Sequence, residues 1–302
     1  MPPRVFALDR RSLRYGVFPR TVSGLELGQI AEVELPEGTF GKGVLGPTLQ
    51  QERSFRTALE DLLGRLEEPV TEASLVVPDG WLRVVFADIE DLPKRGPERQ
   101  EVLRWKLKGL VPFRVEDLRL RAVPVGASSE GSQRWLLAFA VETLTGQLES
   151  AFSANGIRIG YLSNVGLSLL EAIWRAAGRD EPQGVVSVDG AAYTLILADA
   201  AGPAVFRHKS LEADTPVGVV EQMVRRELRL ARSYAAEHGV LPARLFLFAE
   251  AAVEEAWSAW LREELGVAQI RPGRELLRLT AAAEEHDPAR LVPLIGAASS
   301  FV

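Results

Sequence analysis

Short apolar runs separated by polar turns dominate the first part of the chain. Four of these runs have the length and the alternation of β-strands, and they occupy residues 4–8, 13–18, 26–35 and 73–77. Between the third and the fourth run, apolar side chains recur at helical spacing over residues 48–66. Strands that alternate with a helix predict an α/β lobe over residues 1–81, which ends at the turn Pro78-Asp79-Gly80.

The next part of the chain has a different rhythm. Its pattern predicts a strand, a helix, two strands, a helix and a strand, at residues 82–89, 98–110, 118–125, 134–141, 143–154 and 157–162. Trp105 falls at an inward position of the first of these helices, where a core role is expected. Pro112 ends that helix because the residue before a proline avoids helical geometry. We therefore expect a compact α+β module over residues 82–163.

The remainder, residues 164–302, returns to an α/β pattern. Helices are expected at residues 167–177, 216–238, 251–265 and 288–301, and strands at residues 184–198, 204–211, 245–248 and 269–271. The pattern predicts a second lobe, and the last helix could return to the first lobe.

Composition narrows the classes of function. The chain has 302 residues, of which 47% are hydrophobic, and its formal net charge is -6. An acidic chain without a basic arm is not expected to bind nucleic acid. Cysteine is absent and the three histidines are far apart, so no metal site is expected. No apolar run reaches the roughly 18 residues of a membrane span, so contact with a membrane is expected only through a partner.

Two clusters of charged residues are more typical of a solvated surface than of a catalytic or metal site. Asp88, Glu90 and Asp91 stand beside Asp79 near a strand end, where carboxylates are usually solvated. A helix also alternates arginine with glutamate at a spacing that favours surface ion pairs, at Glu221, Arg225, Arg226, Glu227, Arg229 and Arg232.

The most specific pattern lies between residues 73 and 125. Its marks are Leu75-Val76-Val77-Pro78, Val84 to Ile89, Leu92-Pro93, Val102 to Trp105, Val111-Pro112-Phe113 and Glu116-Asp117-Leu118. This pattern resembles the PilM family of type IV pilus assembly proteins, to which the cytoplasmic part of the GspL proteins of type II secretion is related. The resemblance covers nearly the whole chain and is weaker at both ends.

The resemblance implies an α/β fold of the actin-like class, shared by actin, Hsp70 and sugar kinases. In such a fold two lobes enclose a nucleotide, and here residues 82–163 would form the inserted α+β subdomain. Two β-hairpin loops of the form Asp-x-Gly, followed by Ser or Thr, cradle the phosphates in that superfamily. Glycine lets backbone N–H groups approach a phosphate, and the aspartate acts through the metal ion.

In this chain the nucleotide motifs are degenerate. In the first loop Asp9 and Ser12 match, but Arg10 and Arg11 replace the spacer and the glycine, and an arginine there should crowd the pocket. The second loop is found at 187–190, where two alignments remain open. Either Ser187 takes the position of the aspartate, or a short shift restores Asp189 with Gly190 beside it.

The region that would contact adenosine departs from the superfamily as well. Its usual glycine pair is missing after Phe248, and Glu250 brings a negative charge instead. We therefore expect that the chain holds no resident cofactor and has little or no ATPase activity. If it binds a cofactor at all, ATP with Mg²⁺ is the candidate. No catalytic residue is assigned.

Taken with the resemblance, these observations predict a cytoplasmic scaffold, peripheral to the inner membrane. It would bind the cytoplasmic tail of a PilN-like membrane protein in a groove between the first lobe and the module, with Pro112 and Phe113 as anchors. The alternative is a functional ATP-binding protein in which Arg10, Arg11 and Arg14 contact phosphate. A small-molecule kinase would need a carboxylate for its substrate, and none is identified. Homo-oligomerisation stays open.

Overall fold

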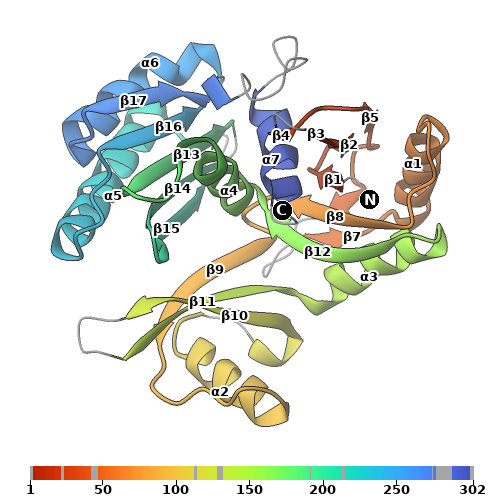
Figure 1. Cartoon of the computed structure of the whole chain (residues 1–302), viewed down its shortest axis with the longest axis horizontal. Coiled ribbons are helices and arrows are strands. Elements are labelled where there is room, and N and C mark those ends of the chain that lie inside the picture. Colours follow the sequence, from red (N-terminus) through yellow and green to blue (C-terminus); the bar gives the residue numbers. More distant parts are fainter. Residues whose placement is uncertain are drawn as a thin grey trace.

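The computed structural model shows two lobes above a smaller module, with the two helices α4 and α7 between the lobes (Figure 1). It describes residues 3–21, 24–41, 47–111, 114–127, 132–190, 192–211, 215–273, 275–276 and 288–299. Among the described helices, none is both long and apolar enough to cross a bilayer.

The first lobe is built on a mixed sheet in which β1 is central. The strand order is β12 (Arg158–Asn164), β8 (Glu72–Val77), β1 (Arg4–Leu8), β2 (Ser12–Val17) and β5 (Ile30–Glu34). The β1 strand pairs antiparallel with β2 and parallel with β8. The helices α1 (Glu52–Gly64) and α3 (Glu142–Ala154) cover one face, where Phe6 of β1 packs between Tyr15 and Phe152.

The module has a three-stranded antiparallel sheet with one helix packed on it. Its strand order is β10 (Leu118–Ala127), β11 (Gln133–Val141) and β9 (Leu82–Asp88). The helix α2 (Pro97–Lys108) buries Leu103 and Leu107, and a 3₁₀ turn, η1 (Val115–Asp117), follows it. Trp105 is 71% exposed, so its predicted core role is wrong. Periodicity placed it inward, but Leu103 and Leu107 define the buried stripe.

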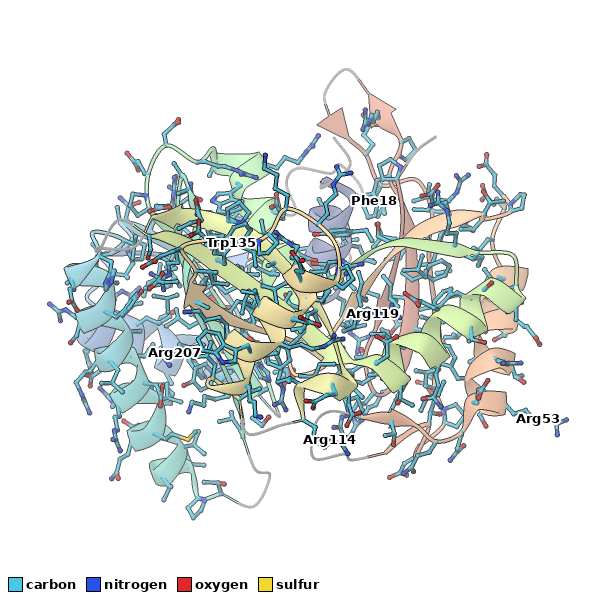
Figure 2. The ribbon with its side chains drawn as sticks, turned by 90° about the horizontal axis from the view of Figure 1, so that it is seen from below. Phe18, Arg53, Arg114, Arg119, Trp135 and Arg207 are labelled. Carbon is cyan, nitrogen blue, oxygen red and sulfur yellow. The ribbon has the colours of Figure 1, made fainter. Side chains whose placement is uncertain are left out.

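The module is smaller than the predicted range 82–163. The last strand of that range, β12, pairs with β8 inside the sheet of the first lobe. The helix before it, α3, contributes Leu148 and Phe152 to the core of the same lobe. The chain therefore leaves the first lobe at β9 and returns to it with α3. Arg119 of β10 holds the boundary through ion pairs with Glu142 and Glu149 of α3, and it is labelled near the centre of Figure 2.

The second lobe has a sheet of the same size. Its strand order is β15 (Gly202–Ser210), β14 (Ala192–Asp199), β13 (Gln183–Asp189), β16 (Arg244–Phe248) and β17 (Gln269–Pro272). The predicted strand 184–198 is a hairpin of β13 and β14. One face packs against α5 (Val217–Glu237), α6 (Ala251–Trp260) and a π-helical turn, η2 (Leu261–Leu265), around Tyr193 and Trp257.

The two lobes share an apolar core built around two helices, α4 (Val165–Ala177) and α7 (Pro288–Ser299). This core joins Val5 and Val76 of the first lobe to Ile196 and Phe246 of the second. Two short hairpins complete the described elements, namely β3 (Arg20–Thr21) with β4 (Gly24–Leu25) and β6 (Phe40–Gly41) with β7 (Thr48–Leu49). The expected last helix thus lies against both β1 and β8 of the first lobe.

The close packing of α4 on α7 depends on a glycine. A Cβ atom at Gly296 would overlap the carbonyl group of Ser168 on α4. The backbones of the two helices therefore meet without a side chain between them, which only glycine permits.

We expect Gly296→Ala to lower the free energy of unfolding by at least about 2 kcal/mol, because the helices must separate to admit the methyl group. Gly146→Ala, in the middle of α3, is the matched control, since a Cβ there meets nothing within 4 Å. The control should be neutral or stabilising by up to about 1 kcal/mol. Thermal unfolding followed by circular dichroism measures both, and equal behaviour of the two variants would refute the close approach.

Candidate functional site

The first hairpin loop is held together by its own aspartate. Asp9 follows β1, and its Oδ1 accepts hydrogen bonds from the backbone N–H groups of Arg11 (2.7 Å) and Ser12 (2.8 Å). Its Oδ2 accepts from the Ser12 hydroxyl (3.0 Å) and from the Arg14 guanidinium (2.9 Å). A carboxylate that bonds the backbone two and three residues ahead makes a tight turn without glycine.

This arrangement has a chemical consequence. The two N–H groups of Arg11 and Ser12 that could face a phosphate are already bonded to Asp9. Arg14 is buried and neutralises the carboxylate, whereas Arg10 and Arg11 are exposed. The N–H groups of Arg11 and Ser12 thus already have acceptors within the loop. The two exposed arginine side chains are the groups left to contact an anion.

The second hairpin loop places both of its candidate residues on one face of the sheet. Asp189 pairs with Ala192 as the last register pair of β13 and β14, so Gly190 begins the turn. Side chains alternate along a strand, so Ser187 and Asp189 share the face of Val185, which packs in the core around α4. Ser187 lies within the paired strand, whereas Asp189 is exposed at its end. Asp189 thus has the position at the hairpin end that Asp9 has in the first loop.

A third acidic residue, Asp79, lies at the junction of all three parts of the chain. It follows β8 of the first lobe, and it is only 6% exposed. Its Oδ1 accepts from the backbone N–H of Gly166 at the start of α4 (2.8 Å). Its Oδ2 accepts from the Thr194 hydroxyl of β14 in the second lobe (2.7 Å). The Thr194 hydroxyl also lies 2.9 Å from Nδ1 of His208 on β15.

Two backbone N–H groups at the N-terminus of α4 are already bonded to side chains of the chain itself. Asn164 caps the helix by accepting from the Leu167 N–H (2.9 Å), and its amide nitrogen donates to the Leu82 carbonyl (2.8 Å). Asp79 accepts a hydrogen bond from the Gly166 N–H. A helix N-terminus attracts anions because its first N–H groups are unpaired, and here a buried aspartate already supplies the anion.

Burial sets the ionisation of this cluster. Desolvation raises the pKa of Asp79 to about 6, opposed by the hydrogen bonds from Gly166 and Thr194, and the charge of Asp189 raises it further. Burial lowers the pKa of His208, while Asp189 acts to raise it and Arg83 of β9 to lower it. Asp79, His208 and Asp189 therefore form one electrostatic group at the meeting point of the lobes.

Two other sequence predictions meet the structure differently. Pro112 and Phe113 lie outside the described residues, so their role as anchors stays a prediction. At the end of β16, where adenosine would be held, Phe248 is buried, and a Cβ at Gly273 would overlap its ring. Sequence reasoning grouped Asp79 with a solvated acidic cluster. It missed the burial because no local pattern shows that β8 ends against α4.

The comparisons with known proteins agree on the fold. No family model matches the chain, and no curated protein matches it by sequence. Among solved structures, a chain of the PilM–PilN type IV pilus biogenesis complex is similar with a TM-score of 0.76, 16% identity, and coverage of 99% of this chain and 98% of that one. The chain thus has the actin-like fold that its sequence predicted.

Two further structures support this conclusion. A protein of unknown function from Bacteroides thetaiotaomicron, with an actin-like ATPase fold, is similar with a TM-score of 0.55, 8% identity, and coverage of 98% of this chain and 95% of that one. The cytoplasmic domain of EpsL, an inner-membrane component of the type II secretion system of Vibrio cholerae, gives 0.50 with 11% identity and 92% coverage of each chain.

Asp79 should make the stability of the protein depend on pH in a defined direction. Its pKa is raised from 3.8 to about 6 on folding, so the native state holds the proton more tightly. Stability from this group is therefore full below about pH 4 and falls as the pH rises through about 6, by about 3 kcal/mol in all.

Asp79→Asn should remove that loss, because a neutral amide accepts from Gly166 and leaves the Thr194 hydroxyl free to donate to His208. We expect the variant to match the wild type near pH 4 and to melt several degrees higher near pH 8. Asp91→Asn, at an exposed carboxyl, is the control and should follow the wild type throughout. Identical curves for Asp79→Asn and wild type would contradict the buried carboxyl.

Proposed function

We propose that this chain is a cytoplasmic scaffold of a type IV pilus or type II secretion inner-membrane platform, and that it binds the cytoplasmic tail of a PilN-like membrane protein. The carrying observation is the fold likeness to a chain of the PilM–PilN complex over 99% of the residues. That coverage includes the module as well as the two lobes. The EpsL likeness points to the same class of assembly.

The tail would lie in a groove between the first lobe and the module, with Pro112 and Phe113 as apolar anchors. The boundary there is held by polar contacts, since Arg119 bonds Glu142 of α3 with an Nη2–Oε1 distance of 2.6 Å. Bound peptides of this kind are usually anchored by a few buried apolar side chains.

We further propose that the nucleotide site is degenerate and that the scaffold works without ATP. In support, the backbone donors of Arg11, Ser12 and Gly166 are bonded to aspartates of the chain itself. A phosphate would have to displace Asp9 from the N–H groups of Arg11 and Ser12 or approach its carboxylate, and the repulsion between like charges makes both unfavourable. Arg10 and Arg11 remain as exposed cations, which suits weak anion contact better than an enclosed site.

The partner proposal is tested with a labelled synthetic peptide that copies the cytoplasmic tail of the PilN-like protein produced by the same bacterium. We expect the full chain to bind it, and Phe113→Ala to weaken the affinity at least tenfold, the cost of losing a central apolar anchor. Val217→Ala, at an exposed apolar residue of the second lobe, is the matched control and should bind as the wild type does. Fluorescence anisotropy gives the dissociation constants. Absence of binding by the wild type would refute the proposed function.

The nucleotide proposal is tested by titrating the protein with ATP and Mg²⁺ in a calorimeter. We expect no heat of binding at micromolar concentrations and no rise in melting temperature with the nucleotide. Micromolar affinity that is lost in Asp9→Ala would contradict a degenerate site. It would favour instead the alternative in which nucleotide state regulates assembly.

A further inference from the structure

A pocket of about 410 Å³ lies on the side of the module that faces the second lobe. Its lining comes from β9, α2, the turn after α2 and β11 of the module, and from the C-terminal end of α5 and the residue after it. These residues are Phe86, Ala87, Asp88, Lys106, Leu110, Arg134, Tyr234 and His238. The volume lies within the range of pockets that hold a small molecule or a few residues of a peptide.

One arginine organises the wall of this pocket. The Arg134 guanidinium lies 4.7 Å from the ring centre of Phe86 and 5.4 Å from that of Tyr234. It also donates to the Ala204 carbonyl of the second lobe (3.2 Å). Arg134 therefore bridges the module and the second lobe, and its planar group is fixed between two aromatic faces. A cation fixed in this way loses little conformational entropy when an anion binds.

The rest of the pocket also combines aromatic or apolar surface with positive charge. His238 stacks on Tyr234 with the ring centres 4.0 Å apart, and its Nδ1 lies 2.8 Å from the Tyr234 carbonyl oxygen, so Nε2 is the other polar atom of the ring. Lys106 adds a second fixed charge, and Leu110 is 49% exposed. Against these groups stands one carboxylate, Asp88. The pocket is thus locally basic and aromatic in a chain whose net charge is -6.

We propose that this pocket binds an acidic peptide segment in which a carboxylate side chain neighbours a large apolar one. The carboxylate would pair with Arg134 and Lys106, and the apolar residue would pack on Leu110, Phe86 and Tyr234. Arginine and tyrosine with partly exposed apolar neighbours are the residues that carry binding energy at protein interfaces. This site goes beyond the proposed function and does not depend on it.

The occupant differs from the tail of a PilN-like protein on grounds of charge. Cytoplasmic segments next to a membrane span carry an excess of lysine and arginine. Such a tail would be repelled by Arg134 and Lys106. The acidic segment therefore belongs to another protein, and its site joins the module to the second lobe, away from the boundary between α3 and β10.

Two lysines of α2 provide a matched test. Lys106 lines the pocket, whereas Lys108 does not. Two residues turn a helix by about 200°, so the two side chains point to nearly opposite sides. Lys106→Glu and Lys108→Glu change the net charge of the protein equally, and only the first changes the pocket.

The probe is a fluorescein-labelled random copolymer of glutamate and tyrosine, which presents acidic and aromatic residues in many orders. We expect the full chain to bind it, Lys106→Glu to weaken binding at least tenfold, and Lys108→Glu to stay within twofold of the wild type. Polyglutamate without tyrosine should bind at least fivefold more weakly than the copolymer. Circular dichroism confirms that each variant is folded, and Leu110→Ala repeats the test without a change of charge.

Three results would overturn the proposal: no binding of the copolymer by the wild type, equal weakening by both lysine variants, or equal affinity for polyglutamate and the copolymer. Sedimentation of the wild type supplies a further check. If the chain self-associates and Lys106→Glu abolishes this, the pocket is a contact between copies of the chain and not a peptide site. The tail peptide is measured in parallel, so failure here is distinct from failure of the proposed function.

Discussion

The arrangement of the lobes depends on one buried carboxyl group. Asp79 belongs to the first lobe, yet it bonds the N-terminus of α4 and a threonine of the second lobe. Gly166 makes this possible, because a Cβ there would come within 3.0 Å of Asp79 Oδ1 and 2.9 Å of Ile196 Cδ1. A buried carboxyl that kept only one of these partners would be costly, since its desolvation would no longer be offset. The bonds therefore favour one relative position of the lobes.

The same constraint bears on what the cleft can bind. In a cleft that binds nucleotide, backbone N–H groups of the loops and of a helix N-terminus have no partner in the protein and donate to phosphate oxygens. Here Asp9 and Asp79 supply the oxygens in advance. The bonds of Asp79 to Gly166 and Thr194 thus hold the two lobes together without a nucleotide. If the chain is the scaffold that we propose, its partner would not have to select a rare closed state.

The sequence allowed the architecture of the chain to be predicted, but not the contacts by which the lobes and the module join. Apolar periodicity located the α-helices and the strands longer than two residues, although it merged β13 with β14. The resemblance of residues 73–125 to the PilM family pointed to the actin-like fold. Local patterns carry no information on which sheet a strand joins, so β12 was assigned to the module although it pairs with β8. Asp79 was placed in a solvated cluster for the same reason. Its burial follows from tertiary packing against α4, which only the assembled fold reveals.

The module carries two regions of different charge, and this difference bears on the two partners that we propose. On one side, Arg119 is already neutralised by Glu142 and Glu149 of α3, so this boundary presents little net positive charge. On the other side, Arg134 is held by two aromatic rings and a carbonyl group, none of which carries a charge, and Asp88 is its register partner on β9. The two cations Arg134 and Lys106 outnumber the one carboxylate, Asp88, among the residues that line the pocket, so the pocket keeps a positive charge that the boundary at Arg119 lacks. A basic tail and an acidic segment would therefore be directed by charge to different ends of the small sheet, before any side-chain fit is made.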